Sequence, residues 1–130
     1  MIESAIVTRL LSDAALLQYS GGRIFVSSAP EGTITPYIVV QSADTIDNSD
    51  AIASFDIDID IYDYQEDQRP LRAATRRVKA VLHEETVPDP EGFYGSIRPS
   101  FESRTFIKEK DATLSRANMN FSSIAIELIP

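Results

Sequence analysis

The sequence predicts an α+β domain in which helices pack on one face of a mainly antiparallel β-sheet. Two observations lead to this prediction: five stretches have the composition or the alternation of strands, and two regions have the spacing of amphipathic helices. Their order along the chain is α-β-β-β-α-β-β. A length of 130 residues, with no internal repeat or linker, fits one domain spanning residues 1–130.

The first helical region is predicted over residues 2–17, where apolar side chains recur at the spacing of one helix face. Ser12 and Asp13 interrupt this stripe, and such residues can cap the start of a second, short helix. The sequence Ser-Gly-Gly at 20–22 ends the region, because glycine readily adopts the left-handed backbone conformation found after helix C-termini.

Three strands are predicted next, over residues 23–28, 37–43 and 53–64, with a loop or the tip of a long hairpin at 44–50. The third strand is the clearest because FDIDIDIYDY alternates apolar and acidic residues, and successive side chains of a strand point to opposite faces. The expected core face comprises Phe55, Ile57, Ile59 and Ile61. The expected polar face comprises Asp56, Asp58, Asp60 and Tyr62.

The second helix is predicted from about residue 67 to residue 85, with Asp67 as its cap. Pro70 falls in its first turn, where the missing proline N–H removes no helical hydrogen bond. Two further strands are predicted at 97–108 and 113–128, joined by the turn EKDA. The apolar stripe of the helix comprises Leu71, Ala74, Val78, Val81 and Leu82.

Composition and charge argue against several classes of protein. No apolar run approaches the ~18 residues of a membrane-spanning helix, and we expect no secretory signal because the N-terminus lacks a basic segment. The absence of cysteine excludes disulfides and fits a reducing cytosol. The net charge of −8 comes entirely from residues 1–65, so simple wrapping of nucleic acid is not predicted.

The aspartates at 56, 58 and 60 raise the question of a metal site. They match the first, third and fifth positions of an EF-hand loop, but that loop needs glycine and glutamate where this chain has Ile61 and Asp67. Alternate side chains of a strand stand about 7 Å apart, whereas calcium needs its ligands at about 2.3–2.6 Å. We therefore predict no metal and no cofactor, and keep a small-ligand or metal-binding domain using Asp56, Asp58 and Asp60 as the alternative hypothesis.

No catalytic set is recognisable. Acid–base catalysis needs carboxylates in unlike environments, and three aspartates on one polar strand face are expected to have similar surroundings. The single histidine, His83, lies near the end of a charged helix, and the serines occur in no G-x-S-x-G elbow. No glycine-rich loop precedes a helix. The sequence therefore predicts a protein that is not an enzyme.

A second charged feature lies on the helix that follows the aspartates. Basic side chains recur every three or four residues opposite the apolar stripe, at Arg69, Arg72, Arg76, Lys79 and His83, with Arg77 beside them. Such a stripe is often only solvated. Alternatively, the basic helix of one subunit faces acidic groups of the next, a head-to-tail contact that can close a ring. Cations for the aspartates can also come from the late strands, on Arg98, Arg104, Lys108 and Arg116.

Several segments resemble the small tail-completion proteins of long-tailed bacteriophages and prophages, the tail-terminator or head-to-tail joining group. LLSDAALLQYSGGRIFVSSAPEGTITPYIVVQ is similar to the opening of that family, and FDIDIDIYDY lies at the position of its alternating strand. RAATRRVKAVLH follows as the family helix does, and LSRANMNF lies in the final hairpin. The aspartate strand is more acidic than the usual polar alternation of the family, and the 44–50 loop is shorter.

The resemblance implies a structural virion protein that forms a ring, commonly a hexamer, at the head-proximal end of the tail. It implies contacts with the major tail tube protein and the head-completion connector protein, passage of DNA through the ring, no membrane partner, and synthesis in the bacterial host cytoplasm. The interface hypothesis comprises Arg69, Arg72, Arg76 and Lys79. Asp56, Asp58 and Asp60 are the candidate lumen lining, because a pore through which DNA slides should not bind phosphate.

Overall fold

A computed structural model describes residues 2–44, 52–64, 66–108 and 113–127. These residues form three helices and five strands in the predicted order, with the first helical region divided in two. The helices are α1 (Ile2–Leu11), α2 (Ala14–Ser20) and α3 (Arg69–Leu82). The strands are β1 (Ile24–Val26), β2 (Tyr37–Asp44), β3 (Ile52–Tyr64), β4 (Tyr94–Lys108) and β5 (Leu114–Glu127).

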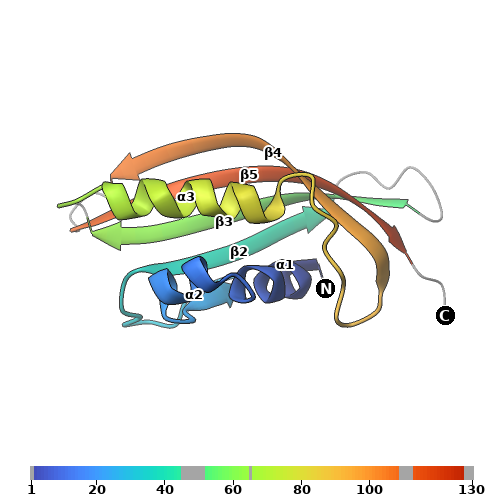
Figure 1. The fold of residues 1–130 in the computed structure, drawn as a ribbon, viewed down its shortest axis with the longest axis horizontal. Helices are drawn as coiled ribbons and strands as arrows, with labels where there is room; N and C mark the ends of the chain where they lie inside the picture. Colours follow the sequence, from blue (N-terminus) through green and yellow to red (C-terminus); the bar gives the residue numbers. More distant parts are fainter. Residues whose placement is uncertain (1, 45–51, 65, 109–112, 128–130) are drawn as a thin grey trace.

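The five strands form one sheet in the order β1-β2-β3-β5-β4 (Figure 1). The pairs β2–β3, β3–β5 and β5–β4 are antiparallel, and only the short β1 pairs in parallel, with β2. The predicted α+β fold with a mainly antiparallel sheet is therefore confirmed. None of the helices in the described part of the chain is both long and apolar enough to span a membrane.

All three helices pack on the same face of the sheet. Figure 1 shows α1 and α2 over β1 and β2, and α3 over β3, β5 and β4. The core face predicted for β3 points toward the helices, because Ile57, Ile59 and Ile61 are at most 1% exposed. Their register partners on β5, Phe121 and Met119 among them, are also buried. Every described helix and strand contributes to one core cluster.

Several boundaries differ from the predictions. Helix α3 is shorter than the helix predicted over residues 67–85, since His83 is extended and Glu84 has a positive φ of 56°. Its N-cap residue is Gln68, although Asp67 still accepts a hydrogen bond from the Arg69 N–H at 3.0 Å. The first strand ends at Val26 instead of residue 28, because Ser27 has a positive φ of 68°. The loop predicted at 44–50 lies outside the described residues except for Asp44, and so does the turn EKDA.

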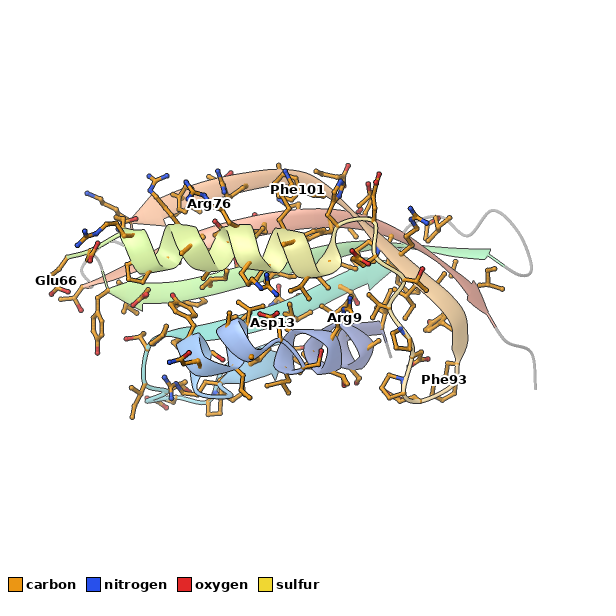
Figure 2. All side chains as sticks on the ribbon, viewed as in Figure 1. Arg9, Asp13, Glu66, Arg76, Phe93 and Phe101 are labelled. Atoms are coloured by element: carbon orange, nitrogen blue, oxygen red, sulfur yellow. The ribbon has the colours of Figure 1, made fainter. Side chains whose placement is uncertain are left out.

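The junction between α1 and α2 forms at the predicted position. The Asp13 side chain accepts a hydrogen bond from the Leu16 N–H at 3.1 Å and caps α2. The same carboxylate accepts hydrogen bonds from the guanidinium of Arg77, so the cap also joins α2 to α3. Figure 2 shows Asp13 at the junction of α1 and α2. Gly21 ends α2 with a φ of 62°, and its N–H donates to the Leu17 carbonyl at 2.8 Å.

Replacing Asp13 by alanine should lower the free energy of unfolding by about 0.5–2 kcal/mol, because the cap of α2 is lost. The hydrogen bond from Arg77 holds the pKa of Asp13 below its usual 3.8. A lowered folded-state pKa gives stability that is complete above the unfolded pKa of about 3.9 and is lost as the pH falls through the folded value.

Urea titrations at pH 7 and pH 3 check this expectation. The difference in unfolding free energy between wild type and Asp13→Ala should be smaller at pH 3 than at pH 7. A difference of the same size at both pH values would show that the charge of Asp13 does not contribute.

Candidate functional site

The side of the sheet away from the helices carries the aspartates, as the alternation predicts. We call this surface the open sheet face and define it by the outward residues of the three central strands. Along the aspartate row these are Tyr37, Val39, Gln41 and Ala43 of β2, Asp56, Asp58, Asp60 and Tyr62 of β3, and Arg116, Asn118, Asn120 and Ser122 of β5. Each aspartate stands beside an amide or hydroxyl side chain of β5, so β5 offers hydrogen-bonding groups along the row.

The three aspartates do not have the similar surroundings expected from the sequence. Asp60 is only 8% exposed and accepts a hydrogen bond from Asn118 Nδ2 at 2.8 Å, whereas Asp56 is exposed. Burial raises the pKa of Asp58, and the charges of Asp60 and Asp56 raise it further. The register accounts for the difference, because Asp56 stands between the small side chains of Ala43 and Ser122, whereas Asp60 stands between Val39 and Asn118.

The cations expected opposite the aspartates are only partly present. Arg116 Nη1 lies 3.8 Å from Asp60 Oδ1. Arg104, by contrast, lies on the helix side, where its Nη1 donates a hydrogen bond to Thr75 Oγ1 of α3 at 3.2 Å. The reason is a register shift between Phe101 and Ser103, which places Arg104 opposite the buried Met119. Among the described residues, neither Arg98 nor Lys108 makes an ion pair within 4 Å.

The aspartate row does not place several carboxylate oxygens around one point, as a metal site requires. No group of three or more histidine, cysteine, aspartate or glutamate side chains within the described ranges could hold a metal ion. Consecutive aspartates of the row are separated by one residue of an extended strand, which spaces their side chains about 7 Å apart.

Calcium or manganese at millimolar concentration should therefore leave the melting temperature unchanged. An ion bound only to the folded state would add about 2.7 kcal/mol at a hundredfold excess over its Kd, which raises the melting temperature by several degrees. Thermal melts of wild type and Asp58→Asn with and without metal make the comparison. A rise in wild type that Asp58→Asn abolishes would show that the open sheet face is a metal site.

The basic stripe of α3 is divided by its contacts. Arg69 pairs with Asp67 at 3.1 Å at the start of the helix, and its side chain is 90% exposed. Arg77 turns toward Asp13. Arg72 lies over the Phe106 ring of β4, 4.3 Å from its centroid, so part of the stripe rests on β4.

An open cleft of about 360 Å³ lies between α3 and β4. We call it the cationic cleft, and it is lined by Arg76, Lys79, Ala80, His83 and Arg104. Lys79 Nζ lies 4.4 Å from the ring centroid of Phe101, and His83 Nδ1 accepts a hydrogen bond from the Phe101 N–H at 2.9 Å. The cleft therefore combines charges from two elements, of which the sequence predicted only the helix.

The family model described as "Tail completion protein gp17" matches residues 4–125. The chain belongs to the tail completion protein gp17 family and is a structural protein rather than an enzyme. The family resemblance read from the sequence is thereby confirmed, and it favours the structural hypothesis over a ligand-binding or metal-binding domain.

Solved structures share the fold. A chain from the structure named "Virion of native gene transfer agent (GTA) particle" superposes with a TM-score of 0.77 at 19% sequence identity, over 96% of this chain and 94% of that one. A second structure, whose name states no function, gives a TM-score of 0.59 at 10% identity, over 99% and 92% of the two chains. The comparison with curated proteins gives no match.

Proposed function

We propose that this tail completion protein forms a closed homo-oligomeric ring, a hexamer, at the head-proximal end of the tail. The ring terminates the tail tube, contacts the major tail tube protein on one side and the head-completion connector protein on the other, and lets DNA pass through its centre. As a virion component of a phage, prophage or related particle, it is made in the host cytoplasm. Residues 1–130 act in this ring as a single domain.

The observation that carries the proposal is the separation of charge across the sheet. The aspartates lie on the open sheet face, and the basic side chains of α3 lie on the helix side. The basic helix side of one subunit can face acidic groups of the next that lie outside the open sheet face, and such a head-to-tail contact forms a ring when the rotation between subunits closes. In this arrangement Arg69, Arg72, Arg76 and Lys79 lie at the subunit interface.

The open sheet face supports the second part of the proposal. Asp56, Asp58 and Asp60 line the lumen in this arrangement. An acidic wall repels the phosphate backbone, so DNA is not held by the counterion release that drives binding to basic surfaces. DNA can then slide through the ring.

Particles produced from a genome that lacks this chain test the function. We expect separate heads and tails in electron micrographs, with few joined particles, and restoration by the wild-type gene supplied in trans. Joined, infectious particles formed in its absence would reject the proposed joining role.

A further inference from the structure

We propose that the cationic cleft is the docking site for a carboxylate-bearing segment of a neighbouring copy of this chain, with Arg104 of β4 as a contact residue. The inference rests on the proposed ring. It adds the chemistry of the contact, and it extends the interface from one helix to the groove that α3 forms with β4. Figure 2 labels Arg76 on α3 and Phe101 on β4, the two elements that border this groove.

The cations around the cleft are held in place before a partner arrives. Arg104 donates to Thr75 Oγ1 and lies 5.2 Å from the Phe106 centroid, while Arg72 lies over the same ring at 4.3 Å. Lys79 lies over Phe101 at 4.4 Å. Contacts of this kind fix long side chains by cation–π attraction, which reduces the entropy that binding must remove.

These cations differ from the other arginines of α3 in their partners. Arg69 and Arg77 each pair with an aspartate of the same chain. Within the part of the chain that the structure describes, no carboxylate lies within 4 Å of Arg72, Arg76, Lys79 or Arg104. Among the described carboxylates, that of Glu84 comes nearest to a cleft residue, with its Oε1 4.0 Å from His83 Nε2. The cleft therefore presents charge that an external anion can neutralise.

The chemistry of the cleft favours a carboxylate of a second copy over DNA. A cleft of about 360 Å³ accommodates one or two carboxylate side chains. The aromatic rings of Phe101 and Phe106 beneath the cations give apolar contacts to the aliphatic part of an acidic side chain. The chain itself carries the anions required, since its net charge is −8, and that same charge repels DNA from the molecule.

Sedimentation equilibrium at low salt tests the cleft with two variants and a matched control. Arg104→Gln and Arg76→Gln should each weaken self-association by about tenfold or more, since the charge of each lies at the contact. Arg98→Gln removes the same charge from the same strand on the opposite face of the sheet, and it should change the association constant by less than about threefold. Because Arg104 donates a hydrogen bond to Thr75, thermal melts check that Arg104→Gln still folds. Arg76→Gln removes no hydrogen bond to a described residue, so it tests the cleft without that complication.

Two probes identify the class of occupant. Hexaglutamate should inhibit self-association of the wild type and should bind Arg104→Gln at least about tenfold more weakly. A duplex oligonucleotide that competes with hexaglutamate and binds more tightly would overturn the proposal in favour of nucleic acid. If both cleft variants form the same oligomer as the wild type, the cleft is rejected as the contact, whereas the proposed ring is retained. A wild type that is monomeric throughout would reject the ring and, with it, a second copy as the occupant.

Discussion

Replacing Ile59 by alanine should lower the free energy of unfolding by about 2–5 kcal/mol, the range for truncating a large buried aliphatic side chain. Ile59 lies at the centre of the sheet, between Val40 of β2 and Met119 of β5, and all three are 0% exposed. The neighbouring strands cannot easily close around the lost atoms because both are held by the β-ladder. Ile57→Ala should have a similar effect, since Ile57 is 1% exposed and faces Phe121.

The matched control is Asp58→Asn, one residue away on the other face. Burial and the neighbouring aspartates raise the pKa of Asp58, so its charged form is disfavoured in the folded state. A raised folded-state pKa contributes stability at low pH that is lost as the pH rises through the folded value. Removing the charge should therefore be neutral or slightly stabilising at pH 7. If urea titrations show a larger loss for Asp58→Asn than for Ile59→Ala, the faces of β3 are assigned wrongly.

Reversing Arg72 and Arg76 to glutamate should abolish the oligomer while the monomer stays folded. Both side chains are exposed on α3, away from the core residues of that helix, so the reversal leaves the core unchanged. Each reversal replaces an attraction to the acidic neighbour with a repulsion, which costs several kcal/mol across an interface. Native mass spectrometry and circular dichroism report assembly and folding separately.

A charge-matched control distinguishes the loss of a local contact from an effect of the total charge of the chain. Reversing Arg98 and Lys108 to glutamate changes the total charge by the same amount from exposed positions on β4. This control should still assemble. If the Arg72 and Arg76 reversal forms the same oligomer as wild type, the stripe is solvated and is not an interface.

The sequence was most informative where a regular element is amphipathic. In β3, the period of two separates isoleucines from aspartates over a long strand, and burial of one face leaves a single consistent orientation. In α3, the apolar stripe identified the buried face correctly, from Leu71 to Leu82. Asp13 was identified as a cap from local chemistry alone, because capping involves neighbouring residues.

The features that sequence reasoning missed depend on distant contacts. Arg98 and Arg104 are an even number of residues apart, so alternation places both on one face, but the shift between Phe101 and Ser103 reverses the alternation. Asp63 lies on the core side of β3 and is only 7% exposed, and Tyr19 of α2 satisfies its carboxylate by donating a hydrogen bond at 2.7 Å. No local pattern in the sequence marks the bulge or this partner.

The mass of the wild-type oligomer as a function of salt decides whether identical subunits form a ring held by complementary charge. At low salt we expect one discrete multiple of the chain mass. That species should dissociate as the ionic strength rises past physiological values, where exposed charges are screened beyond ~8 Å. A chain that is monomeric at every salt concentration, or an oligomer that salt strengthens, would rule out a ring held by charge.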